Sequence, residues 1–371
     1  MKTKIIFTKI ILILSVCANA QALKPFNITI NEIKDRYALQ TAAVDLANAN
    51  KLQNNYLWYM QGPRRQFDYY DANVKKMNSQ ETKDFYINLF ADNDILFFGE
   101  MHVYALPHIV TMNYIEEYNE YAKLNGLKPV THVLWERSQN YERVLNNVKA
   151  RQNKANSLEE KLDVCRAMAD EAYQNSDLLL AQTCRLLAKG VEVICADTPK
   201  DYKNNDSYIK DTDIGMTDKE GMKLRNLHTI AHMEASLAGG GKVAAFGGAM
   251  HMVYGDPHKN PSLPDLALKI FPKHKIISVY NTGGQAESEY WPPSLMTGRF
   301  EKEEQPNPYK RVYYKGFFIF SEYITNDTHV VLNIIPPGTK NKALYNMRPA
   351  DIMLLIKRDF MFSDAKELIM R

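Results

Sequence analysis

The sequence predicts an α/β fold: a central, mainly parallel β-sheet flanked by helices, preceded by a helical region and followed by a β-pair. Short apolar runs, each long enough for one buried strand, alternate with longer segments of helical periodicity. Polar side chains suited to chemistry follow several of these runs directly. The chain has 371 residues, 45% of them hydrophobic, which is ample for a large core.

The apolar runs and the segments between them define the predicted sheet and its helices. The predicted strands are Ile95–Phe98, Thr131–Trp135, Val191–Ala196, Lys242–Phe246 and Lys275–Tyr280. The predicted helices are Pro107–Leu124, Asn140–Lys149, Leu158–Tyr173, Ser176–Lys189 and Thr217–Ala238. Gly190 stands where a helix commonly ends, and Thr217 with Glu220 has the spacing of a capping box. Strands that alternate with helices in this way favour parallel pairing.

The flanking regions differ from this core, which spans about residues 93–282 of a predicted domain 93–371. Residues 21–92 are predicted to be helical, with helices at Asn31–Leu52 and Ser79–Leu89, the latter with a weak capping-box spacing from Ser79 to Thr82. A late β-pair is expected at Val312–Glu322 and His329–Ile335, with a closing helix near Pro349–Lys357. The polar segments Asp201–Gly215 and Asn281–Pro308 are predicted loops that cover or line a pocket.

The first 20 residues have the pattern of a secretory signal peptide. Lysines precede an apolar run from Ile10 to Val16, and Ala18-Asn19-Ala20 is a small-x-small cleavage pattern. The run is too short to span a membrane. A lipoprotein anchor at Cys17 is the alternative, which Val16 fits poorly. We therefore expect an exported chain, periplasmic or secreted, without an integral membrane span.

Charge and cysteine usage exclude two classes of protein. The signal segment holds three lysines and no acidic residue, so its removal lowers the formal charge from +3 to 0. Nucleic-acid binders carry a concentrated basic patch, which this sequence lacks. The three remaining cysteines exclude a disulfide scaffold. A bridge from Cys165 to Cys184 is permitted but not predicted, and Cys195 is expected to be a core residue.

Candidate site residues lie where predicted strands end. Glu100 and His102 follow the first strand, Glu136 and Arg137 the second, Asp197 the third and His251 the fourth. In an open parallel sheet these ends face one crevice, so we expect a shared site there.

Histidines and one arginine outside the strand ends complete the candidate set. Arg225 lies on the capped helix before the fourth strand, and we expect it to join the site. His228 and His232 fall on the same helical face as Arg225 but are more typical of packed residues. The remaining histidines have no motif around them: His108, His132, His258, His274 and His329.

The order of these motifs resembles a superfamily of erythromycin esterases, ChaN-like haem-uptake proteins and Tiki/TraB/GumN proteins. The resemblance rests on four motifs spread over about half of the chain: Phe98-Gly99-Glu100-Met101-His102, Trp135-Glu136, Arg225-Asn226 and Gly248-Ala249-Met250-His251. It implies an α/β fold with its site at the strand ends. It does not imply a single function, because one fold hosts several.

Three functions follow from the branches of this superfamily. In the esterase branch His102 would be the general base, Glu100 and Glu136 would orient it or carry protons, and Arg225 and His251 would stabilise an oxyanion. The Tiki branch implies a metalloprotease. Its divalent ion would be held by His102, His251, Glu100 and Glu136.

The ChaN branch implies haem binding without catalysis, for which Tyr104, His108 or His258 would have to be an exposed axial ligand. We favour an exported hydrolase of an ester or amide bond in a small-molecule or peptide substrate, acting with or without a metal. Haem binding is the alternative.

Overall fold

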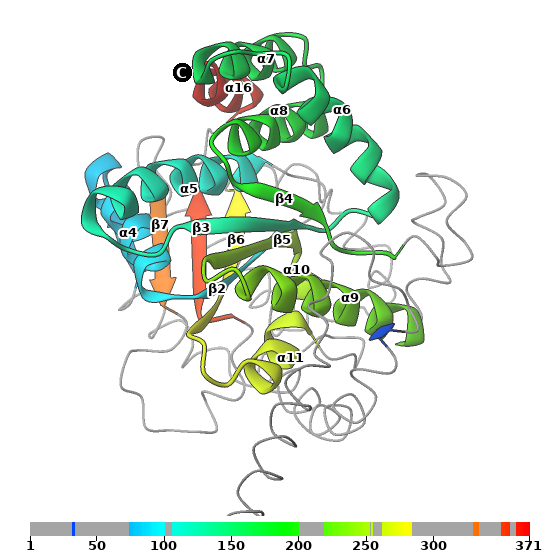
Figure 1. Ribbon diagram of the computed structural model, residues 1–371. Helices are drawn as coiled ribbons and strands as arrows, with labels where there is room; N and C mark the ends of the chain where they lie inside the picture. The colour runs from blue at the N-terminus through cyan, green and yellow to red at the C-terminus, as the bar shows by residue number, and fades with distance from the viewer. Residues whose placement is uncertain are drawn as a thin grey trace, which may run out of the picture.

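The structure is a computed structural model, which describes residues 32–33, 74–100, 106–199, 219–252, 254, 262–283, 329–333, 350–356 and 361–371. A β-sheet lies between two layers of helices: α4, α5 and α8 cover one face, and α9, α10 and α11 cover the other (Figure 1). The predicted α/β fold is therefore confirmed.

The sheet is mainly parallel. Its described strands are β1 (Val74–Met77), β2 (Ile95–Glu100), β3 (Val130–Trp135), β4 (Glu192–Cys195), β5 (Lys242–Gly248), β6 (Ile276–Gly283), β7 (His329–Asn333) and β8 (Ile352–Ile356). Their order across the sheet is β1-β7-β8-β6-β2-β5-β3-β4. The run from β8 to β4 is parallel throughout, whereas β7 is antiparallel to both β1 and β8.

The described helices are η1 (Gln139–Tyr141), α4 (Ser79–Asp92), α5 (Leu106–Asn125), α6 (Glu142–Gln152), α7 (Leu158–Asp170), α8 (Asn175–Ala188), α9 (Lys219–Leu237), α10 (Ala249–Met252), α11 (Leu263–Ile270) and α16 (Phe362–Met370). Those from α4 to α9 lie close to the predicted positions, whereas α10, α11 and α16 form where the sequence analysis predicts no helix. The weak capping-box spacing at Ser79 is not the one used. Asn78 caps α4 instead, in a capping box with Glu81, because its carboxamide accepts a hydrogen bond from the Glu81 amide.

Alternation along the central strand separates two cores. Leu96 and Phe98 of β2 belong to the core beneath α4, α5 and α8, and Phe98 stacks on Phe246 of β5 with ring centroids 5.0 Å apart. Ile95 and Phe97 point the other way, into the core beneath α9 and α11. All six residues of β2 are buried, which explains why its sequence is a continuous apolar run rather than an alternating one.

Two predictions for the flanking regions are wrong. Ile352–Ile356 lies within the predicted closing helix but forms β8, hydrogen-bonded between β6 and β7. Periodicity alone does not separate a five-residue apolar run in a strand from one in a helix. Val74–Met77 forms β1 within the region predicted to be helical, where it pairs with β7.

Other predictions for these regions are only partly covered by the structure. Of the predicted late pair, His329–Asn333 is a strand, and Val312–Glu322 lies outside the described residues. The signal segment, Cys17, most of residues 21–73 and both predicted loops also lie outside them. No helix in the described ranges has the length and apolar character needed to cross a membrane.

The chain connectivity shows where the central strands leave the sheet at their carboxyl ends. Strands β2 and β5 are neighbours in the sheet, with Gly99 opposite Gly247. The chain leaves β2 toward α5 on one face and leaves β5 toward α10 and α11 on the other. Adjacent strands whose connections diverge in this way form a topological switch point, the usual ligand site of such sheets.

Candidate functional site

Glu136 is the first residue after β3, and its side chain crosses toward the end of β5. Its carboxylate is almost fully buried and accepts a hydrogen bond from the backbone amide of Gly248. This approach requires glycine at position 247. A Cβ there would lie 2.7 Å from the Cβ of Glu136 and 2.7 Å from the Cε of Met252.

Arg225 projects from α9 and bridges two carboxylates. Its Nε donates to Oδ1 of Asp197 at 2.7 Å, and its Nη2 donates to Oε1 of Glu136 at 2.9 Å. Burial alone would lower the pKa of Arg225, but the negative charges of Asp197 and Glu136 outweigh burial and raise it. The guanidinium is therefore a permanent charge that joins the ends of β3 and β4.

Asp197 lies two residues beyond the last residue of β4 and is held on both carboxylate oxygens. Thr198 donates from Oγ1 to Oδ2 at 2.9 Å, while Arg225 occupies Oδ1. Burial would raise the pKa of Asp197, but Arg225 and His251 outweigh this effect and hold the pKa below its usual value. Asp197 is therefore an anion in the folded protein at neutral pH.

His251 comes from the short helix α10, directly after β5, and has both ring nitrogens engaged. Nδ1 lies 2.6 Å from Oδ1 of Asn226, and Nε2 lies 3.4 Å from Oε1 of Glu136. Because a carboxamide oxygen can only accept a hydrogen bond, Nδ1 carries the proton in this arrangement. The other nitrogen, Nε2, consequently faces the carboxylate.

Among the described residues of this group, the formal charges are unequal in number. Two carboxylates, Glu136 and Asp197, contact one guanidinium, so these three side chains carry a formal charge of −1 beside the His251 ring. Protonation of His251 brings the formal charge of the group to zero. The arrangement can therefore hold and release a proton at Nε2 of His251, which is what acid–base chemistry requires.

The same residues are a candidate metal group by donor type. One donor atom from each of Glu136, Asp197 and His251 lies within 4.8 Å of the others. Their carboxylate oxygens, however, accept hydrogen bonds from Arg225, Thr198 and Gly248. A divalent ion would have to sit beside the guanidinium, so the observed arrangement does not fit a resident metal.

Glu100 lies apart from this group. Its side chain is 5% exposed and turns toward α5, where its Oε1 lies 3.7 Å from Nε2 of His108. His108 is buried edge-on against Phe246, with ring centroids 5.1 Å apart. The structure therefore places Glu100 on the α5 side of the sheet and Glu136 on the α9 side.

The remaining predicted site residues are only partly covered. His102 and two of the suggested haem ligands, Tyr104 and His258, lie outside the described residues. The third suggested ligand, His108, is 2% exposed. Arg137 stacks over Trp135, with its guanidinium carbon 5.0 Å from the ring centroid, and so packs beside the site instead of entering it.

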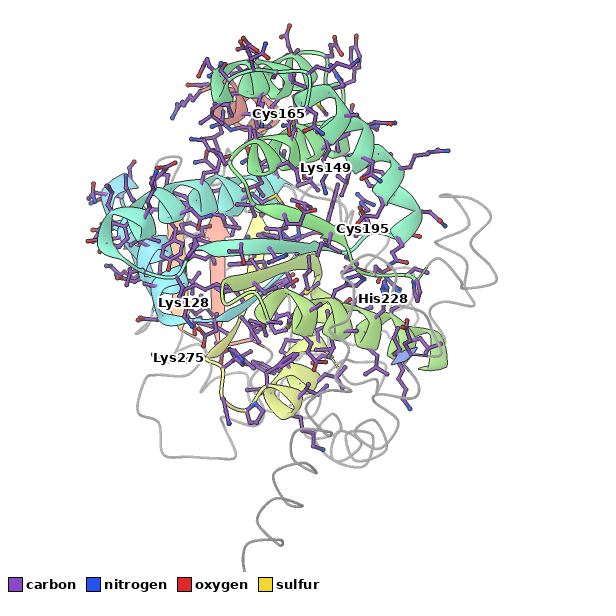
Figure 2. All side chains as sticks on the ribbon, in the orientation of Figure 1. Lys128, Lys149, Cys165, Cys195, His228 and Lys275 are labelled. Carbon is purple, nitrogen blue, oxygen red and sulfur yellow. A yellow bond between two sulfur atoms is a disulfide. The ribbon has the colours of Figure 1, made fainter. Side chains whose placement is uncertain are left out.

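His228 and His232 lie on α9, on the side that meets the end of β4. Figure 2 shows His228 and Cys195 near this end of the sheet, whereas Lys128 and Lys275 lie at the opposite end. Both histidines are fully buried, and His228 contacts backbone oxygens of Ala196 and Asp197. They surround Asp197. Among the described residues, no hydrogen bond or ion pair joins either histidine to Glu136 or His251.

The sequence alone does not indicate the roles of Asn226 and Asp197. Asn226 neighbours Arg225 on α9, and consecutive helical positions point about 100° apart. Arg225 can therefore hold a carboxylate while Asn226 holds an imidazole. For Asp197 the sequence signal is its place as an acidic residue directly after an apolar run.

Comparison with known proteins finds only distant structural likeness. No protein-family model matches the sequence, and no curated protein matches it. Among solved structures, the type III effector HopBA1 matches with a TM-score of 0.31 and 16% identity, over 51% of this chain and 83% of that one.

A structure described as cofacial heme binding to ChaN of Campylobacter jejuni matches with a TM-score of 0.31 and 10% identity, over 57% of this chain and 91% of that one. At these levels neither structure carries an argument about activity.

Proposed function

We propose that this chain is an exported hydrolase that cleaves an ester or amide bond at the carboxyl ends of β3, β4 and β5. The observation that carries the proposal is the buried group of Glu136, Asp197, Arg225 and His251. Its described members combine an oriented imidazole with two carboxylates and one guanidinium. Fixed charges and an oriented imidazole in a buried site are the usual means of catalysing acyl transfer.

In the proposed reaction His251 is the proton donor. Asn226 holds Nδ1, so a proton on Nε2 rests between the ring and Glu136 and can pass to the leaving oxygen or nitrogen. Glu136 stabilises the imidazolium before that transfer. The leaving group departs with the proton, and His251 is left neutral.

Arg225 has a different role from the one expected. The oxyanion role needs a guanidinium that points at substrate, whereas its described hydrogen bonds go to Asp197 and Glu136. We therefore assign Arg225 to holding the two carboxylates in place. His102 remains our proposed base, which takes a proton from the attacking water as the oxygen adds to the carbonyl carbon.

The metal-assisted and haem-binding alternatives have less support. The carboxylates that would hold a divalent ion are paired with Arg225, so the proposed reaction uses no metal. An axial haem ligand must reach the porphyrin, and His108 is buried between Glu100 and Phe246. No described residue favours haem over hydrolysis.

One structural feature supports the proposed export. Cys165 of α7 and Cys184 of α8 form a disulfide, with Cα atoms 5.4 Å apart. Structural disulfides form and persist mainly in oxidising compartments. This agrees with the signal-like segment at residues 1–20, and Cys195 remains a buried free thiol, as expected.

The test is a hydrolysis screen combined with metal analysis. Mature protein, residues 21–371, would be assayed on nitrophenyl esters and peptide nitroanilides, with and without chelator, as wild type, His102→Ala and the control His329→Ala. We expect turnover that resists chelator, disappears in His102→Ala and persists in His329→Ala. No hydrolysis of any substrate, or undiminished turnover in His102→Ala, would contradict the proposal. Stoichiometric metal lost in parallel with activity would make the enzyme a metallohydrolase.

A further inference from the structure

Two buried histidines on α9 have no part in the proposed reaction. His228 and His232 are both 0% exposed, and their rings meet edge to face with centroids 4.5 Å apart. Burying two ionisable rings is costly unless their nitrogens form hydrogen bonds. Their partners therefore show what the pair does.

The contacts define which nitrogen carries a proton. Nδ1 of His228 lies 2.9 Å from the carbonyl oxygen of Ala196 and 3.1 Å from that of Asp197. Carbonyl oxygens only accept, so this nitrogen is protonated. In a neutral ring Nε2 of His228 is then an acceptor. Nε2 of His232 lies 3.1 Å from this nitrogen, and Nε2 of Gln139 in turn lies 3.4 Å from Nε2 of His232.

This pair holds the backbone that delivers Asp197 to the site. Thr229 adds a second donor to the carbonyl of Ala196, at 2.8 Å. On the opposite side the amide of Asp197 donates to the carbonyl of Arg137, at 3.1 Å, so the end of β4 is fixed from both directions. Arg225 and His228 are three residues apart on α9 and hold the same aspartate, one by its carboxylate and the other by its backbone oxygen.

We propose that His228 and His232 are positioning residues for Asp197. His232 packs edge to face against the His228 ring, and His228 holds the carbonyls of Ala196 and Asp197 so that the carboxylate meets Arg225. The catalytic consequence rests on the proposed hydrolase function, because Asp197 matters to turnover only if this group reacts. The positioning itself is a statement about geometry and is testable without a substrate.

The Nε–H of Arg225 is a direct reporter of this alignment. It donates to Asp197 Oδ1 at 2.7 Å, so it should give a shifted NMR signal, protected from exchange and assignable by its loss in Arg225→Lys. We expect His228→Leu and His232→Leu to raise its exchange rate by about tenfold or more, the signature of local opening. His228→Asn should preserve the signal, because the carboxamide nitrogen replaces Nδ1 as donor.

A matched control separates positioning from loss of stability. Met233 is also fully buried on α9 but packs in the core beneath the helix, so Met233→Ala should lower the melting temperature and leave the Arg225 signal protected. Equal protection of that signal in His228→Leu and in wild type would overturn the proposal. So would loss of the signal in His228→Asn to the same extent as in His228→Leu.

A second measurement applies if the leucine variants do not fold. Long-range proton–nitrogen spectra of the wild-type imidazoles should show a proton on Nδ1 of His228, which faces two carbonyl oxygens. A His228 ring that carries its only proton on Nε2 would contradict the proposal. If the hydrolase screen fails while this tautomer and the protected Arg225 signal are found, the proposed function falls and the positioning role stands.

Discussion

Two buried arginine–glutamate groups in the described part of the chain differ in the number of charges that they bring together. Arg185 of α8 pairs with Glu116 of α5 through two hydrogen bonds, from Nε at 3.2 Å and from Nη2 at 3.0 Å. Gln182 donates to the same carboxylate, and Arg185 also donates to the carbonyl of Ile369, at 2.7 Å. In this group the guanidinium of Arg185 pairs with the carboxylate of Glu116, and the other hydrogen bonds are to neutral groups.

The group around Arg225 also joins arginine to glutamate, but its described side chains include a second carboxylate and an imidazole. Here one guanidinium serves two carboxylates, Glu136 and Asp197, and an imidazole completes the group. The Arg185 pair joins α5, α8 and the C-terminal helix α16, whereas the Arg225 group joins strand ends at the switch point. The comparison indicates that a balanced buried pair is structural, and that an excess charge beside a titratable ring is suited to chemistry.

The largest expected effect comes from removing the imidazole. His251→Gln should lower kcat by about 10²–10⁴-fold, the usual contribution of a general acid or base. The melting temperature should change little, because an amide can still bond Asn226. Kinetics on the substrate found by the screen would measure this. His274→Gln is the control, since His274 is 38% exposed and should retain wild-type kcat.

Breaking the balanced pair should affect stability alone. Arg185→Met should lower the free energy of unfolding by about 3–5 kcal/mol, because Glu116 is left as a buried unpaired charge. Denaturant unfolding would measure the loss. The double variant Arg185→Met with Glu116→Met should recover most of it, and kcat should match wild type in both folded variants. A large fall in kcat in the double variant would contradict the assignment of this pair to structure.

A smaller effect is expected in the acid dependence of stability. The pKa of Asp197 is lower in the folded protein than in the unfolded chain, so its contribution is fully present above the unfolded value of about 3.9 and is lost as pH falls through the folded value. Asp197→Asn should remove about 2 kcal/mol at neutral pH, typical of a hydrogen bond to a charged group. Unfolding midpoints measured from pH 7 down to pH 2 should converge for the two proteins. A constant difference across that range would show that Asp197 is not the group that titrates.

The sequence predicted what depends on local pattern. Continuous apolar runs such as Ile95–Phe98 and Lys242–Phe246 form buried parallel strands, and Glu100 and His251 lie at or just beyond their carboxyl ends. It failed at Ile352–Ile356, where five apolar residues fit a strand or a helix equally well. Only pairing with β6 and β7, both distant in sequence, decides between the two.

For a similar reason, the sequence does not predict that Glu100 and Glu136 lie on opposite sides of the sheet. Whether Glu100 and Glu136 face the same side depends on the pleat, strand order and register of strands far apart in sequence. The structure turns Glu100 toward His108 and Glu136 toward Arg225. The register between β3 and β5 likewise places Gly247 against the Glu136 side chain, where only glycine leaves enough room.

The most direct test of this account compares Glu136→Gln with Glu116→Gln. Both changes neutralise a buried carboxylate that pairs with arginine, and each side chain is 7% exposed. Turnover of the screened substrate and unfolding free energy would be measured at a temperature where both variants are folded. We expect Glu136→Gln to lose about 10²-fold or more in kcat, and Glu116→Gln to lose stability with kcat unchanged. Equal loss of kcat in the two variants, or full turnover in Glu136→Gln, would contradict the central claim that the unbalanced group is the reactive one.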